Sequence, residues 1–339
     1  KKKIVTARTP GKLILSGEHA VVHGAPALAI AINRHIETTV QKGNGPDILF
    51  DIKSLGLQKH IPLVIVNKIK DKIAKQYKKF RDGKLSITDV LKQPIDLAYY
   101  TFANVFEGIT GGMEAGSEIS IHSDIPMSCG MGSSAASTTC LLTALNEAYT
   151  LTLPQSKLIK LAIESESLQH GISSGLDVHV VTQGGCLYFQ KGASETRSLP
   201  QFPLHIAMTG KPISSTGDCV EAVAPLFENS DLLQRFTETT QQLDQAIQEN
   251  DLTTIKKMIR RNHQLLVEIG VVPPIVQTFI NQLESADVAA KICGAGAIAG
   301  DQAGAVLMVG DMQKAKLIAE NFKFPIELIE GADRGSHIL

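Results

Sequence analysis

The spacing of hydrophobic and polar residues predicts that strands and helices alternate in the first part of the chain. Runs that are rich in β-branched residues, or that alternate with polar ones, predict strands at 4–7, 13–15, 27–40, around 119–121 and at 184–189. Apolar residues spaced three and four apart predict helices at 61–80, 95–108, 133–149 and 154–169. The lysines between the apolar positions of the first helix are interpreted as its solvated face.

The pattern restarts after Pro200 and Pro203, and this restart marks the predicted domain boundary. Helices are predicted at 218–226, 232–248, 252–269, 274–283 and from Met312 onward. Strands are predicted at 204–208, 305–309 and 325–329, and a glycine-rich segment covers 294–304. The chain is therefore expected to be a mixed α+β protein of two domains, 1–200 and 201–339, with a cleft between them.

The bulk composition is that of a globular protein with enough chain for two domains. The 339 residues are 43% hydrophobic and 20% charged, and 33 lysines and arginines nearly balance 34 acidic residues. A charge this close to neutral does not favour binding to nucleic acid or to a bulk membrane surface. We therefore expect a small-molecule ligand and no nucleic-acid or membrane partner, and we leave a homodimer open.

No feature of the sequence predicts export or insertion into a membrane. No apolar run approaches the ~18 residues of a membrane span, and the three opening lysines precede no signal-peptide segment. The five scattered cysteines include no Cys-x-x-Cys pair, so buried free thiols are expected. We expect a cytoplasmic protein; a peroxisome-like organelle stays open, although the ending 336–339 is only loosely similar to a peroxisomal signal.

The segment 126–136, Pro-Met-Ser-Cys-Gly-Met-Gly-Ser-Ser-Ala-Ala, carries the strongest chemical signal in the chain. Its two glycines and two serines immediately precede a predicted helix. Glycines allow close approach of the backbone, and the free N–H groups and dipole of a helix N-terminus favour an anion such as a triphosphate. An ordinary serine cap after a glycine turn explains the same residues. The loop is not the usual P-loop, because no Lys-Ser/Thr pair follows the glycines.

Glu166 lies on the inward stripe of the predicted helix 154–169, because Ile159, Ala162 and Ile163 precede it at helical spacing. A carboxylate that points inward requires a cation, and Mg²⁺ prefers such oxygen ligands together with water and nucleotide phosphates. The alternative is that Glu166 is a simple surface charge of the helix.

Asp177 and Lys12 are the candidates for catalysis. Asp177 ends a polar loop and begins an apolar element, where it either caps a helix or accepts the proton of an attacking hydroxyl. Pro10 and Gly11 predict a turn directly before Lys12, which places this lysine at the edge of the cleft. There its ammonium would stabilise developing negative charge, whereas a surface lysine at a strand start is the ordinary alternative.

Three ordered segments together resemble the GHMP family of small-molecule kinases over essentially the whole chain. Residues 10–24, Pro-Gly-Lys-Leu-Ile-Leu-Ser-Gly-Glu-His-Ala-Val-Val-His-Gly, resemble the first motif of members that phosphorylate mevalonate. Residues 130–136 resemble the family's ATP motif, and residues 291–300 resemble its third motif. The resemblance implies ATP- and Mg²⁺-dependent phosphorylation of mevalonate in isoprenoid precursor synthesis. It also implies an N-terminal α/β domain with a left-handed crossover, a C-terminal ferredoxin-like domain and a site between them.

The resemblance assigns roles to individual residues. It places nucleotide contacts on Gly130, Met131, Gly132, Ser133, Ser134 and Ala135, and Mg²⁺ ligands on Ser133, Ser134 and Glu166. It makes Asp177 the catalytic base and Lys12 its assistant. It assigns the acceptor pocket to Glu18, His19, Thr216, Gly294, Ala295 and Gly296.

The third motif departs from the family pattern. The family has a run of glycines after Gly-Ala-Gly, whereas Ala297, Ile298 and Ala299 stand here before Gly300. Each added Cβ limits how closely this loop can approach a ligand.

Other readings of the motifs remain to be tested. Residues 294–299 also match the Gly-x-Gly-x-x-Ala pattern of a dinucleotide-binding oxidoreductase, but too few residues separate Gly300 from the strand at 305–309 to form a crossover helix. A sensor that binds ATP without chemistry would be expected to lack Asp177 or Lys12. Phosphomevalonate, galactose and homoserine are the alternative acceptors, because a fold does not determine a substrate.

Overall fold

β1 (Ile4–Ser16) and β2 (Ala27–Lys42) are the two long antiparallel strands of the first sheet, in a computed structural model that describes residues 3–109 and 116–339. β1 runs through both segments that the sequence predicts as separate strands. The predicted turn before Lys12 is wrong: the pairing register shifts between Pro10 and Gly11, so these residues form a bulge. A bulge accommodates a proline, which has no N–H to donate to the ladder, without ending the strand.

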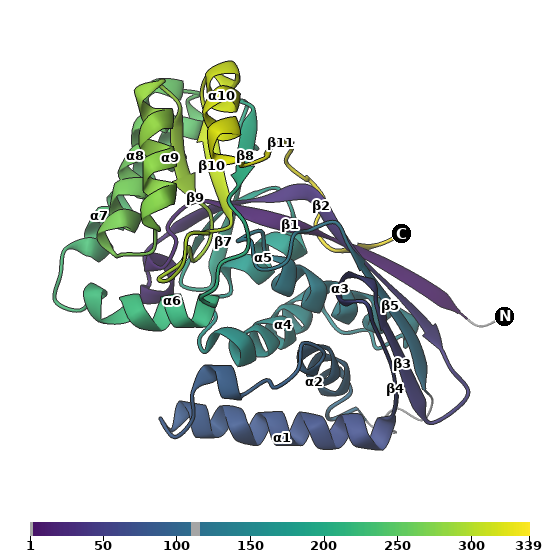
Figure 1. Ribbon diagram of the computed structural model, residues 1–339. Coiled ribbons are helices and arrows are strands. Elements are labelled where there is room, and N and C mark those ends of the chain that lie inside the picture. Colours follow the sequence, from purple (N-terminus) through teal and green to yellow (C-terminus); the bar gives the residue numbers. More distant parts are fainter. Residues whose placement is uncertain (1–2, 110–115) are drawn as a thin grey trace.

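The first sheet has eight strands, of which six follow the order β12-β1-β2-β5-β3-β4, while β6 pairs with β2 and β7 (Figure 1). The other strands are β3 (Asp47–Ile52), β4 (Leu57–Pro62), β5 (Ser117–Ser123), β6 (Cys186–Gln190), β7 (Ala193–Arg197) and β12 (His337–Ile338). β5 and β6 confirm sequence predictions. The sequence analysis missed β3, β4, β7 and β12; β4 and β7 are largely exposed and therefore lack a buried alternating face.

Five α-helices accompany the first sheet among the described residues: α1 (Leu63–Arg81), α2 (Asp96–Val105), α3 (Ser133–Ala148), α4 (Gln155–His170) and α5 (Leu176–Gln183). The first four confirm predicted helices, whereas the sequence analysis missed α5. β3 and β5 are parallel, and β4, α1 and α2 supply the crossover between them. α3 contacts both β1 and β2 and is buried along most of its length. Short 3-10 helices lie at Ala20–His23, Lys53–Leu55 and Ile87–Asp89.

The second sheet has four strands in the order β11-β8-β10-β9, all antiparallel to their neighbours. They are β8 (Leu204–Met208), β9 (Ala289–Ile292), β10 (Ala305–Val309) and β11 (Ile326–Ile329). Because the sequence order across the sheet is 4-1-3-2, the arrangement is ferredoxin-like. The accompanying helices are α6 (Thr216–Val223), α7 (Leu232–Gln248), α8 (Leu252–Glu268), α9 (Pro274–Ser285) and α10 (Met312–Phe322), and a 3-10 helix lies at Ala224–Phe227. The predicted α+β fold is confirmed.

The two parts of the molecule pack closely. One hydrophobic cluster contains buried residues of both sheets, and α7 and α8 contact β1. The end of the chain returns to the first sheet, where β12 pairs with β1. All five cysteines are buried free thiols, as predicted. Of the helices that the described residues form, none is long and apolar enough to cross a membrane. The boundary at 200/201 stays a prediction.

Candidate active site

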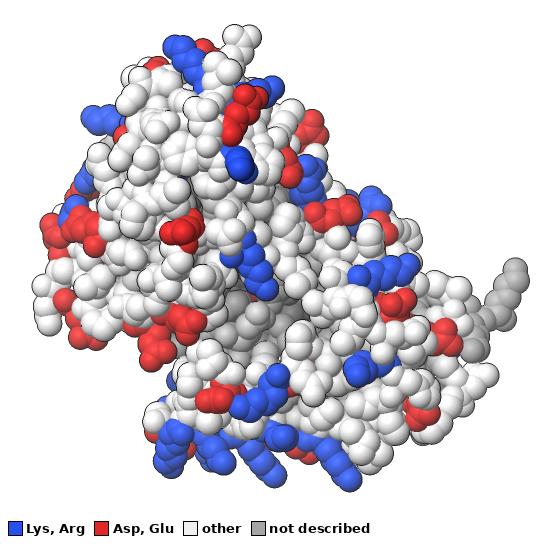
Figure 2. Space-filling view, viewed as in Figure 1, with Lys and Arg blue, Asp and Glu red and all other residues white. Residues whose placement is uncertain are grey.

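A cavity of about 700 Å³ lies between the two parts of the molecule. Figure 2 shows the surface hollowed at this place. Its walls come from both sides: β1, the loop before α3, α4 and α5 on one side, and segments 211–216 and 293–296 on the other. Every residue that the sequence analysis assigns to the site lines this cavity.

The loop before α3 places two backbone segments in direct contact. Gly130 has φ 80°, and a Cβ at this position would lie 2.1 Å from the carbonyl oxygen of Cys293, so only glycine fits. On the other side, the Lys12 N–H donates to the Met131 carbonyl at 3.0 Å. Gly132 is the N-cap of α3 and provides no side-chain cap, so first-turn N–H groups stay available to an anion at the cavity wall.

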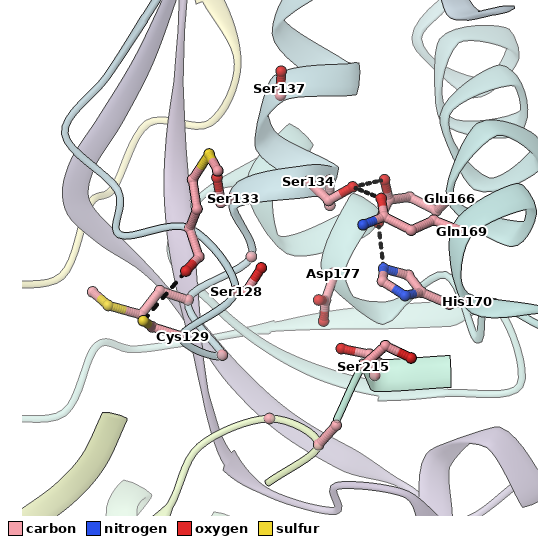
Figure 3. Close-up of a pocket in the computed structure, with 18 of the residues that line it drawn as sticks. Ser128, Cys129, Ser133, Ser134, Ser137, Glu166, Gln169, His170, Asp177 and Ser215 are labelled. Atoms are coloured by element: carbon pink, nitrogen blue, oxygen red, sulfur yellow. Dashed lines mark hydrogen bonds and ion pairs between the residues drawn. The ribbon is translucent and has the colours of Figure 1, made fainter. Parts of the chain in front are cut away.

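Glu166 is buried in the cavity wall, which confirms its predicted inward position. Its side chain is 4% exposed, and Ser134 Oγ donates to Oε1 at 2.6 Å (Figure 3). His170 Nε2 lies 3.4 Å from Oε2. Within residues 3–109 and 116–339, no lysine or arginine forms an ion pair with this carboxylate, and no cluster of three His, Cys, Asp or Glu could hold a metal. A cation held here therefore needs further ligands from a bound molecule.

Lys12 and Asp177 form an ion pair beside the loop. Lys12 Nζ lies 3.1 Å from Asp177 Oδ2 and donates to the Gly130 carbonyl at 3.1 Å. The lysine side chain is only 3% exposed, whereas that of Asp177 is 37% exposed and faces the cavity (Figure 3). Asp177 lies in the first turn of α5, and the N-cap is Gly175, so the alternative reading of Asp177 as a cap is wrong. The carboxylate is oriented by a buried cation and open to a ligand.

Glu18 and His19 also line the cavity, in the connection between β1 and β2. Both carboxylate oxygens of Glu18 are bonded to the second part of the molecule, one to Lys291 Nζ and the other to Asn262 Nδ2. His19 Nε2 lies 2.9 Å from the Ala295 carbonyl, so this nitrogen donates. Burial lowers the pKa of His19 below its ordinary value, so the ring is neutral near pH 7 and Nδ1 is an acceptor.

The third motif forms the loop between β9 and β10. Gly294, Ala295 and Gly296 line the cavity, whereas Ala297 is buried and its N–H donates to the Val271 carbonyl. No helix separates β9 from β10 in this described part of the chain, which excludes the dinucleotide-binding reading. Thr216 begins α6 and lines the cavity. The chemical roles predicted for these residues stay predictions.

Two features of the cavity escaped the sequence analysis. One end is apolar, and its side chains include Ile52, Leu55, Leu97, Ala98 and Leu141. They come from separate elements, so no local pattern could identify them. The other is Lys211, which lines the cavity, is exposed and forms no ion pair with any residue that the structure describes. A lysine placed between a glycine and a proline was a weak signal for this cation.

Comparisons with known proteins agree with the geometry. Residues 96–185 match the GHMP kinases N terminal domain, and residues 244–299 match the GHMP kinases C terminal domain. A mevalonate kinase of Pyrococcus horikoshii is 30% identical, over 87% of this chain and 86% of that protein.

Solved structures show the same fold. The mevalonate kinase of Methanococcus jannaschii superimposes with a TM-score of 0.76 and 22% identity, over 98% of each chain. Galactokinase of Lactococcus lactis, solved with galactose, has a TM-score of 0.74 and 16% identity, over 99% of this chain and 95% of that one. Proteins with different named substrates therefore share this fold.

Proposed function

The chain belongs to the GHMP kinases, among the mevalonate kinases, and we propose that it transfers the γ-phosphoryl group of ATP to the primary hydroxyl of mevalonate. The product is 5-phosphomevalonate, a precursor of isoprenoids. The observation that supports this reaction best is the Lys12–Asp177 pair, which lies 3.1 Å apart next to an uncapped helix N-terminus. An anion site beside an oriented carboxylate is what phosphoryl transfer to an alcohol requires.

In the proposed mechanism each residue acts on the reacting groups by position and charge. The N–H groups at the start of α3 bind phosphate oxygens, and Ser133 and Ser134 add hydroxyl contacts. Asp177 accepts the proton of the attacking hydroxyl, and Lys12 stabilises the negative charge that develops on that oxygen. His19, Thr216 and the segment 294–296 form the wall against which the acceptor lies.

The apolar end of the cavity is proposed to hold the adenine. Ile52, Leu55, Leu97 and Leu141 offer a dry surface to a flat base, whereas the serines at the start of α3 are among the polar groups of the cavity.

The residues around Glu166 suit Mg²⁺. One buried carboxylate and the hydroxyl of Ser134 are hard oxygen ligands, and Mg²⁺ completes its shell with nucleotide phosphates and water. When bound, Mg²⁺ neutralises phosphate charge. We propose Glu166, Ser133 and Ser134 as its protein ligands.

Glu166→Gln should raise the Mg²⁺ concentration for half-maximal turnover by about tenfold, because the amide keeps the hydrogen bond from Ser134 but loses the charge. A Mg²⁺ titration at saturating ATP and mevalonate measures this shift. Glu164→Gln is the matched control, because Glu164 lies on the same helix and bonds to Tyr100 instead. If Glu166→Gln needs the same Mg²⁺ concentration for half-maximal turnover as the wild type, Glu166 does not bind Mg²⁺ and its role is structural.

Lys211 is proposed to bind the carboxylate of mevalonate. Lys12 is already paired with Asp177, whereas Lys211 forms no ion pair among the described residues. Lys211→Gln should raise the KM for mevalonate about tenfold and leave kcat and the KM for ATP unchanged.

A neutral triol analogue of mevalonate, which lacks the carboxylate, provides the control for the Lys211→Gln measurement. The wild type should discriminate against the triol, and Lys211→Gln should discriminate less. A change confined to the KM for ATP would place Lys211 on the nucleotide phosphates instead. Lys323→Gln, at the exposed end of α10, should change neither the KM for mevalonate nor the KM for ATP.

The proposed reaction is tested by ADP release from Mg·ATP with mevalonate, phosphomevalonate, galactose and homoserine as acceptors. Turnover with mevalonate alone supports the proposal, and turnover with another acceptor overturns the assignment of the acceptor pocket. ATP binding without turnover would favour the sensor. Cytoplasmic location and a homodimer stay predictions.

A further inference from the structure

Lys291 is a fully buried lysine that does not line the cavity. It lies on β9 of the second sheet, yet its ammonium bonds to the first part of the chain. Nζ donates to the Ile14 carbonyl at 3.0 Å and forms an ion pair with Glu18, which is itself 1% exposed. A buried ammonium is costly unless it is paired and hydrogen-bonded. The charge of Lys291 is therefore neutralised across the interface between the two sheets.

The ion pair belongs to a larger buried network. Asn262 Nδ2 donates to Glu18 at 3.0 Å, and Ser16 Oγ donates to Asn262 Oδ1 at 3.0 Å. Thr240 Oγ1 lies 2.7 Å from Ser16 Oγ. Because Ser16 already donates its proton to Asn262, Thr240 is the donor in this bond. Every residue of this network is at most 1% exposed. Because each link joins residues 16–18 to α7, α8 or β9, the network fixes the end of β1 against the second domain.

The network ends at a strained part of the acceptor wall. His19 follows Glu18 and has φ 60° and ψ −52°, and the Ala20 N–H donates to the Glu18 carbonyl at 2.6 Å across it. This γ-turn is unfavourable for a residue with a side chain and persists only where its surroundings hold it. His19 in turn bonds to Ala295, four positions after Lys291. One segment, 291–295, therefore holds both Glu18 and His19.

We infer that Lys291 is a positioning residue for the acceptor alcohol, and this inference rests on the proposed function. Its pairing with Glu18 holds the His19 turn against the third motif, so that the acceptor lies at a fixed place relative to Asp177. Glu18 acts through this pairing, because each of its carboxylate oxygens is bonded to a residue of the second part of the molecule.

The double variant Lys291→Met/Glu18→Met tests this inference. A buried ion pair that is replaced by apolar side chains of similar volume is often tolerated, so the variant should unfold near the wild-type temperature. It should bind ATP with an unchanged Kd and lose about thirtyfold in kcat/KM for mevalonate, since small misplacements of reacting groups are costly. The single variant Lys291→Met leaves a buried unpaired carboxylate and should unfold at a clearly lower temperature.

Two further variants separate positioning from other roles. Glu18→Gln keeps an oxygen acceptor for Lys291 but leaves the buried ammonium without a counter-charge, so it should unfold at a lower temperature than the double variant. Arg197→Gln/Asp244→Asn removes another ion pair between the domains, which lies outside the cavity, and should leave kcat/KM within twofold of the wild type.

Three outcomes would decide against the inference or its premise. A stable Lys291→Met/Glu18→Met variant with kcat/KM near that of the Arg197→Gln/Asp244→Asn control would make the network structural only. If Lys291→Met keeps kcat/KM at a temperature at which it is folded, the loss in the double variant would be assigned to direct substrate contact by the Glu18 carboxylate. If the wild type does not phosphorylate mevalonate at all, the proposed function fails, whereas the unfolding temperatures still report whether the buried pair forms.

Discussion

Asp177→Asn is expected to lower the turnover of mevalonate by about 10²–10⁴-fold, the usual contribution of a general base. In the wild type, Lys12 Nζ lies 3.1 Å from the Asp177 carboxylate. The amide oxygen of the variant can still accept a hydrogen bond from Lys12, so the local structure should be kept. The amide cannot accept the proton of the attacking hydroxyl. Because the proposed phosphate site lies at the start of α3 and not on Asp177, the Kd for ATP should stay within a few-fold of the wild type.

Single-turnover measurements of phosphomevalonate formation, together with ATP titration by fluorescence or calorimetry, separate chemistry from binding for this variant. Asp231→Asn is a suitable control, because Asp231 is an exposed aspartate whose one ion-pair partner among the described residues is Arg235. An unchanged rate with Asp177→Asn would remove Asp177 from the mechanism and leave positioning by the other cavity residues as the source of catalysis.

The sequence predicts those parts of the site whose functional residues lie close together in the chain. The segment 130–136 combines glycines, serines and the start of a helix, and the structure places it at the cavity as expected. Glu166 was recognised as inward-facing because helical spacing alone determines which side of α4 it occupies. In both cases the local pattern fixes the geometry that matters.

Contacts between distant residues are harder to predict than local patterns. The family resemblance predicts that Lys12 assists Asp177, but no local pattern predicts their contact, because most of the first domain separates them in sequence and the packing of α5 near β1 brings them together. In the sequence Lys291 is only the first residue of the third motif, because the strand β9 that contains it was not predicted. Its burial against Glu18 appears only when the second sheet packs on the first. The Pro10–Gly11 bulge was predicted as a turn because local propensity does not include the ladder that continues on both sides.

Lys12→Met is expected to lower kcat by about 10²–10³-fold, the effect of removing one charged group that stabilises the transition state. Methionine keeps most of the apolar stem, which matters because Lys12 packs against Gly132: a Cβ on that glycine would lie 2.7 Å from Lys12 Cγ. The variant should therefore fold, and Asp177, which is 37% exposed, remains solvated without its partner. A kcat within twofold of the wild type would show that the ammonium is not needed for chemistry.

The double variant Lys12→Met/Asp177→Asn shows whether the two residues act as one unit. If Lys12 acts only through Asp177, it orients the carboxylate and stabilises the hydroxyl oxygen from which this carboxylate takes the proton. In that case, adding Lys12→Met to Asp177→Asn causes little further loss of activity. The double variant should then lose about as much activity as Asp177→Asn alone. If the losses multiply instead, Lys12 acts independently, and its bond to the Gly130 carbonyl points to the transferred phosphoryl group as its target. The cycle thus distinguishes stabilisation of the attacking oxygen from stabilisation of the phosphate.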